Sequence, residues 1–200
     1  MPASDDEPRD VLPARQEPSN RVAARTLAWV EHAVIGLNLC PFAKAPWAKG
    51  QVRCVVSVSR DPAGLLDELC TELRLLVETD PHQTETTLLV VPDQFAEFDD
   101  FNDFLDDADA AIAALDLEGT VQIASFHPRY RFAGTAPEEL DNATNRAPYP
   151  TLHLLRESSV ERAVEAFPQA EAIYETNIRT LRELGESGWA ALQERIARAR

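Results

Sequence analysis

Short apolar runs alternate with stretches of helical spacing along the chain. Four runs have the length and composition of single strands: residues 52–58, 86–91, 120–126 and 151–155. Between them, apolar residues recur at the spacing of one helix face, first in Leu65, Leu66, Leu69, Leu73, Leu76 and Val77 and then in Phe98, Phe101, Leu105, Ile112 and Leu115. Helical connections of this length favour parallel pairing of the strands they join. The pattern predicts an α/β fold with a mixed or mostly parallel sheet of about four strands, flanked by helices.

Further helices are predicted at both ends of this unit. Ser19 or Asn20 can cap a helix that ends near Asn38, with an apolar stripe of Val22, Leu27, Val30, Val34 and Leu37. Asp61 followed by Pro62 has the form of a helix N-cap and first helical residue. After the fourth strand, Ser158 and Glu161 have capping-box spacing. Two more helices are expected at residues 169–184 and 189–198, separated by Gly185 and Gly188.

The amino-terminal segment differs in composition from the rest. Residues 1–18 contain four prolines and scattered charges, so they cannot bury enough apolar surface to offset the entropy of ordering. We expect a flexible acidic, proline-rich tail there and a single α/β domain over residues 19–200.

Composition and charge exclude several classes of protein. The net charge of −15 disfavours binding to nucleic acid phosphates. No apolar run approaches the roughly 20 residues that span a bilayer, and the amino terminus is acidic where a signal peptide is basic and then apolar. The three cysteines lack CxxC spacing, which argues against a disulfide framework or a zinc knuckle. We expect a cytoplasmic protein that binds neither nucleic acid nor membrane; a homo-oligomer is compatible with the sequence.

The segment from Phe126 to Arg156 concentrates polar chemistry in an otherwise acidic chain. If residues 127–132 are extended, His127, Arg129 and Arg131 share one side. Further candidates to bind an anion or substrate are Asn142, Asn145, Arg146, Tyr149 and Arg156. Arginine suits bidentate contact with carboxylate or phosphate, so we predict an anion pocket at the carboxyl ends of the third and fourth strands. In the alternative, these arginines pair with Glu138, Glu139, Asp141 and nearby acidic helices.

Three residues are candidate catalytic groups. His127 precedes Pro128 at a strand end, and His153 faces away from Leu152 and Leu154 in the fourth strand. Cys40 follows the first helix, where the negative end of the helix dipole raises a thiol pKa; a buried, inert thiol is the alternative to a nucleophile. Together the three have the composition of a zinc site, but no short ligand spacing supports one, so no metal is predicted.

Three segments then occur in order: WVEHAVIGLNLCPFA, QIASFHPRYRFAG and DNATNRAPYPTLHLLRESSVERAV. In them the chain resembles the bacterial domain-of-unknown-function family catalogued as DUF 1415, over roughly residues 20 to 185. The resemblance implies a family without an established activity, and therefore supplies no catalytic residues.

Two functions of different classes are compatible with these observations. The first is an enzyme acting on a small anionic metabolite through residues 126–156, with His127 as general acid or base. The second is a non-catalytic anion-sensing or protein-interaction module. We favour the enzyme, because clustered His, Arg, Asn and Tyr side chains on a long loop resemble a built site. The expected partner is a small phosphate or carboxylate, and the sequence identifies no cofactor.

Overall fold

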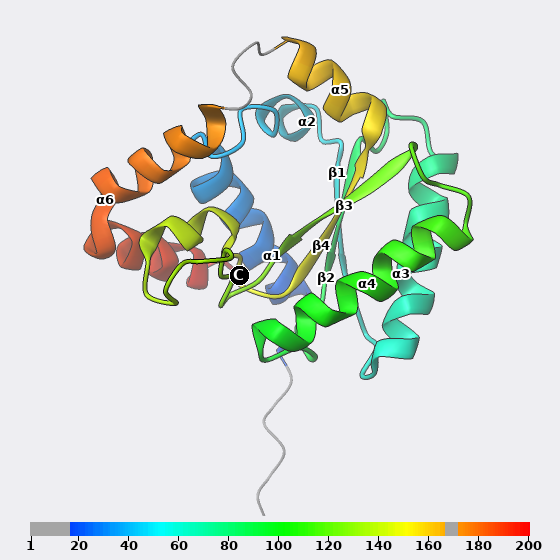
Figure 1. Cartoon of the computed structure of the whole chain (residues 1–200), viewed down its shortest axis with the longest axis horizontal. Helices are drawn as coiled ribbons and strands as arrows, with labels where there is room; N and C mark the ends of the chain where they lie inside the picture. Colours follow the sequence, from blue (N-terminus) through cyan, green and yellow to red (C-terminus); the bar gives the residue numbers. More distant parts are fainter. Residues whose placement is uncertain (1–16, 167–171) are drawn as a thin grey trace, which may run out of the picture.

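A four-stranded sheet lies at the centre of the protein (Figure 1). The computed structural model describes residues 17–166 and 172–200. The strands are β1 (Val52–Val56), β2 (Thr86–Val90), β3 (Val121–Phe126) and β4 (Thr151–Arg156). All four lie within two residues of the predicted apolar runs, which confirms the strand assignments.

The sheet is mixed, in the order β1-β2-β4-β3. β1 and β2 pair in parallel, whereas β4 is antiparallel to both β2 and β3. The first three strands therefore run in one direction, as their helical connections predict, and β4 runs the opposite way between two of them. Phe126 pairs with Thr151 where β3 ends and β4 begins, and Val121 pairs with Arg156 at the opposite end of the two strands. This register fixes which side chains of the candidate site can meet.

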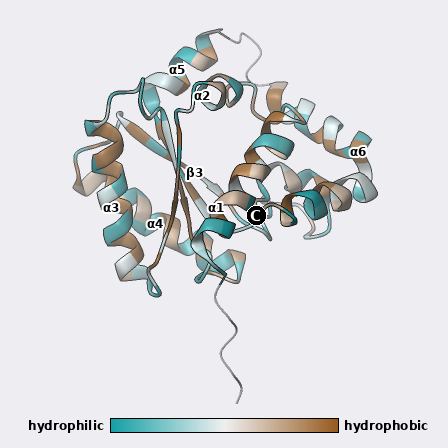
Figure 2. Ribbon diagram, turned by 180° about the vertical axis from the view of Figure 1, so that it is seen from behind, coloured by the Kyte–Doolittle hydropathy of each residue, from teal (hydrophilic) through white to brown (hydrophobic). Residues whose placement is uncertain are grey.

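Helices α3 (Pro62–Glu78) and α4 (Phe98–Ala114) cover one face of the sheet (Figure 1). The predicted N-cap of α3 is confirmed, because the Asp61 carboxylate accepts a hydrogen bond from Gly64 N at 2.8 Å. Apolar and polar positions alternate along α3 as expected for a helix with one buried face (Figure 2). The core on this face includes Leu65, Leu69, Leu73, Leu76, Leu89, Phe101, Phe104, Leu152 and Leu154.

The second core, on the other face, involves α1 (Ser19–Trp29), the π-helical turn η1 (Val30–Ile35) and α6 (Ala172–Ala197). Of the predicted stripe, Val22 and Val30 are buried in this core and Val34 and Leu37 pack against it, whereas Leu27 is not part of it. Thr26 and Trp29 are buried as well, which the sequence did not predict. Thr26 can be buried because its hydroxyl donates to Val22 O at 2.9 Å. The helix is preceded by Pro18 and has no side-chain cap, so capping by Ser19 or Asn20 was wrong.

The carboxyl-terminal helix has one break. Gly185 adopts φ 69° within α6, a left-handed conformation that favours glycine. Of the two predicted separators, Gly185 is confirmed, while Gly188 lies inside the helix after the break. The expected start of this helix at residue 169 lies outside the described residues.

Three short elements complete the fold: α2 (Lys44–Ala48), the 3-10 helix η2 (Leu140–Asn145) and α5 (Glu157–Ala166). α5 follows β4 without a break and begins one residue before Ser158. The predicted capping box at Ser158 was therefore wrong, because the backbone is already helical there.

Most of the predicted tail, residues 1–16, lies outside the described residues. No helix in the described part of the chain is both long enough and apolar enough to cross a membrane.

Candidate functional site

His127 is part of the core and does not share a side with the two arginines that follow it. Its side chain is 1% exposed, whereas Arg129 and Arg131 are exposed. The backbone turns after His127, since Tyr130 N donates to His127 O at 3.1 Å. The predicted extended segment 127–132, and the shared cationic side that depended on it, were wrong.

Both ring nitrogens of His127 are occupied. Nδ1 accepts from Arg129 N at 3.0 Å, so the proton lies on Nε2, which donates to Phe95 O at 2.9 Å. The ring also packs against Phe98 and Phe101. Burial lowers the pKa of His127, favouring the neutral form. In this geometry His127 ties the end of β3 to the segment before α4.

Arg129 and Arg131 bind acidic residues at the start of α4. Arg129 Nη1 donates to both Glu97 oxygens at 2.6 Å, and Arg131 Nη2 lies 3.4 Å from Asp99 Oδ1. All four side chains are well exposed, so each pair contributes no more than about 1 kcal/mol. Pairing of these arginines with an acidic helix is the alternative that the sequence left open.

His153 is on the sheet face opposite Leu152 and Leu154, as its position in the strand predicts. Its Nε2 lies 2.7 Å from Thr86 Oγ1, which itself donates to Leu154 O. The hydroxyl thus accepts from the ring. Desolvation lowers the pKa of His153 to about 4, so the imidazole is neutral near pH 7.

Cys40 lies between two helical segments. Its carbonyl accepts from Ala43 N at 3.2 Å in the turn that leads into α2. Burial raises the pKa of the Cys40 thiol, although the backbone N–H groups of Phe42 and Ala43 act in the opposite direction. The position after the first helix predicted a raised pKa from the helix dipole. The direction agrees, but the main cause is burial. This environment suits an unreactive thiol at neutral pH.

Asn142 and Asn145 hold the backbone of the long loop together. The fully buried Asn142 accepts from Phe132 N and Thr135 Oγ1 and donates to Ala136 O. Asn145 Nδ2 donates to Ser125 O at 3.3 Å. The two amides thus form hydrogen bonds with the loop itself and with β3.

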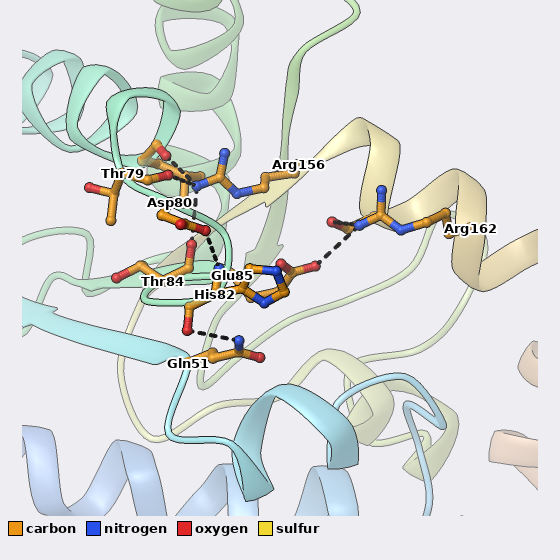
Figure 3. A network of polar contacts seen from close by, with 10 residues as sticks. Gln51, Thr79, Asp80, His82, Thr84, Glu85, Arg156 and Arg162 are labelled. Atoms are coloured by element: carbon orange, nitrogen blue, oxygen red, sulfur yellow. Dashed lines mark hydrogen bonds and ion pairs between the residues drawn. The ribbon is translucent and has the colours of Figure 1, made fainter.

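Arg156 is the last residue of β4 and lies at the opposite end of the strands from His127. Its Nη2 donates to the carbonyl oxygens of Leu76, Thr79 and Thr84, near the carboxyl end of α3 (Figure 3). Because β4 is antiparallel to β3, the carboxyl ends of these two strands point to opposite ends of the sheet. The predicted pocket at both ends was therefore wrong, and Arg156 stabilises the turn between α3 and β2.

A pocket of about 250 Å³ lies between α1, the segment before β4 and the second half of α6. We call it the α1–α6 pocket. It is lined by Arg25, Trp29, Arg146, Ala147, Pro148, Tyr149, Trp189, Gln193, Ile196 and Ala197. Figure 1 shows α1 and the end of α6 next to each other near the carboxyl terminus. The lining thus combines two guanidinium groups, a phenol and two indoles.

A carboxylate is bound at this pocket by two of its lining residues. Glu17 Oε1 lies 2.7 Å from Arg25 Nη1, and Tyr149 Oη donates to Glu17 Oε2 at 2.6 Å. Arg25 Nη1 also donates to Tyr149 Oη at 3.3 Å. Burial raises the pKa of Tyr149, and its bond to Glu17 acts in the same direction, so the phenol keeps its proton.

The second guanidinium of the pocket has a different environment. Arg146 donates to the carbonyl oxygens of Tyr130 and Pro137. No carboxylate of the described residues lies within ion-pair distance of it. Burial lowers its pKa, and the negative charge of Glu138 acts in the opposite direction. Arg146 still carries its charge at neutral pH, because an arginine cannot be deprotonated under these conditions.

The structure therefore gathers two of the predicted site residues, Arg146 and Tyr149, and separates the others. Sequence reasoning missed Arg25 and Glu17, since Glu17 was assigned to the tail. Arg25 and Trp29 have the four-residue spacing that places a cation beside an aromatic ring on one helix face, and this signal was available. Within the described part of the chain, no group of three His, Cys, Asp or Glu side chains is arranged to hold a metal.

Comparison with known proteins gives a family and nothing more specific. A family model described as "Protein of unknown function (DUF1415)" matches residues 21–191. No curated protein and no solved structure matches the chain.

Proposed function

Since the chain belongs to the DUF1415 family of proteins of unknown function, we propose its function from the α1–α6 pocket: non-catalytic binding of a small carboxylate. The observation that carries this proposal is the carboxylate of Glu17, held between Arg25 and Tyr149. A site that binds one carboxylate with a guanidinium and a phenol has the donors to bind another.

The size and lining of the pocket favour one class of ligand. Its volume of about 250 Å³ is below the roughly 300–1,000 Å³ of pockets for drug-sized molecules. Trp29 and Trp189 supply apolar walls, and Arg146 adds positive charge. A carboxylate attached to a single flat ring matches this combination, whereas a nucleotide is too large.

The environments of the candidate catalytic groups support binding over catalysis. His127 and His153 have lowered pKa values and hydrogen-bonded rings, and the pKa of Cys40 is raised. None of the three is among the described residues that line the pocket. The anion-sensing alternative therefore fits the geometry better than the enzyme that the sequence favoured.

Tryptophan fluorescence tests this proposal, because two of the three tryptophans line the pocket. We expect benzoate to change the emission and raise the melting temperature, while benzamide, its neutral counterpart, does so much less. Arg25→Ala should weaken benzoate binding by about ten-fold or more, since it removes a charge-assisted hydrogen bond.

Arg74→Ala is the matched control, because it removes an exposed arginine from α3 on the other side of the sheet. It should bind benzoate as the wild type does. The proposal fails if benzoate changes neither emission nor melting temperature in any variant, or if Arg25→Ala binds as tightly as Arg74→Ala.

A further inference from the structure

Glu17 is the described residue closest to the amino terminus, and its contacts reach a full two turns along the following helix. The carboxylate bonds to Arg25, lies 4.0 Å from Arg21 Nε and accepts from Tyr149, which precedes β4. The Glu17 side chain is 24% exposed, and that of Arg25 is 28% exposed. Glu17 thus covers the donors that a ligand carboxylate would need.

Removal of this side chain from its site would break no backbone hydrogen bond within the described residues. The first turn of α1 is closed by Pro18 O, which accepts from Arg21 N at 2.9 Å and from Val22 N at 3.2 Å. Pro18 has φ −59° and ψ 135°, so the chain is extended just before the helix. Glu17 can therefore rotate away while α1 keeps its first turn.

The charges at the pocket also favour exchange of one carboxylate for another. Without Glu17, the pocket would hold the guanidinium groups of Arg25 and Arg146 with no paired carboxylate among the described residues. Arg25 Nε is buried and has no hydrogen-bond partner in the described structure. A ligand that brings its own carboxylate restores the lost ion pair, whereas a neutral ligand does not.

We propose that Glu17 is a tethered competitor for the α1–α6 pocket: a ligand carboxylate binds Arg25 and Tyr149 only after the Glu17 side chain has left them. This inference rests on the function proposed above. A short tether holds a group at an effective concentration on the order of millimolar, so a free ligand must exceed that competition to bind. The residue would set a concentration threshold for occupancy of the pocket.

Glu17 could instead serve to position Arg25 for the ligand, and this role predicts the opposite effect of its removal. A competitor lowers the apparent affinity, so its loss tightens binding. A positioning residue pre-organises the guanidinium, so its loss weakens binding. The sign of the change separates the two roles.

The experiment is a titration of Glu17→Gln with benzoate, in which tryptophan fluorescence measures binding. Glutamine keeps the size of the side chain and removes the charge that pairs with Arg25. We expect about ten-fold tighter benzoate binding, the change for one lost charge-assisted hydrogen bond in the competing state. Glu31→Gln, which neutralises an exposed glutamate of η1, is the control for the altered net charge and should bind as the wild type does.

The outcomes distinguish the two proposals. If Glu17→Gln binds benzoate no more tightly than the wild type while Arg25→Ala loses binding, the pocket binds carboxylates and Glu17 is not a competitor. If Glu31→Gln tightens binding as much as Glu17→Gln, the effect is one of net charge and the competitor is again excluded. If no variant binds benzoate, Glu17→Gln included, the function proposed for the pocket fails as well.

Discussion

Desolvation favours the neutral form of both His127 and His153. His127 and His153 each form a hydrogen bond through Nε2, and burial lowers both pKa values. The sequence places His153 correctly on the face opposite its leucine neighbours, because side chains alternate along a strand. It could not show that Thr86, 67 residues away in the chain, supplies the bonding partner. The role of a histidine in or next to a strand is therefore ambiguous until its bonding partners are known.

The lowered pKa of His153 predicts a pH-dependent loss of stability. Between the ordinary value of 6.5 and the folded value of about 4, the folded protein binds fewer protons than the unfolded chain. The unfolding free energy should therefore be fully retained above pH 6.5 and fall as the pH decreases towards 4. The contribution is at most about 3 kcal/mol, and the partial exposure of His153 reduces it.

His153→Gln should remove this part of the pH dependence. Urea unfolding of wild type and variant at pH 7.5 and pH 5 measures the difference. His82→Gln, at an exposed histidine in the turn before β2, should retain the wild-type pH dependence. Equal pH dependence in His153→Gln and the wild type would show that His153 is not desolvated in solution.

At the scale of elements, apolar spacing predicts the strands and the long helices, but it does not predict the shape of the loop from β3 to β4. Its shape depends on the turn at His127, on the Asn142 hydrogen bonds and on the ion pair between Asp141 and Arg182 of α6. All are specific pairings without a periodic pattern. α2 was missed for a similar reason, since a five-residue helix contains too little sequence for its spacing to stand out.

Asn142 is the residue on which the loop depends most directly. Asn142→Ala removes one donated and two accepted hydrogen bonds and leaves partly buried groups such as Phe132 N without these partners. We expect the unfolding free energy to fall by about 2–4 kcal/mol. Asn102→Ala, at an exposed position on α4, should change it by less than about 0.5 kcal/mol. Urea denaturation followed by circular dichroism tests this; similar stabilities of the two variants would contradict a structural role for Asn142.

At the scale of the whole molecule, two cores share one sheet. The sequence predicts the α/β class and the common direction of the first three strands. The place of β4 could not be predicted, because the β3–β4 loop is long enough to reach several positions in the sheet. The candidate anion pocket was misplaced for the same reason: its predicted geometry assumed that the carboxyl ends of both strands meet.

The shared sheet predicts that both cores unfold together. Trp29 and Trp189 are in the second core and Trp47 packs against it, so fluorescence reports that side of the sheet. Far-UV circular dichroism reports helices on both sides, including α3 and α4. The two urea transitions should coincide. Separate midpoints would mean that the chain contains two independently stable units.

The central position of β4 has a consequence for how the protein is made. β3 pairs with no other strand of the described sheet, so it has no partner until β4 is available. On the ribosome, β1, β2 and β3 emerge before β4, and of these three strands only β1 and β2 can pair in the native register. The unpaired edges of β2 and β3 stay exposed while about 30 further residues are synthesised, a delay on the order of seconds. This interval is the period in which the nascent chain most needs protection from aggregation.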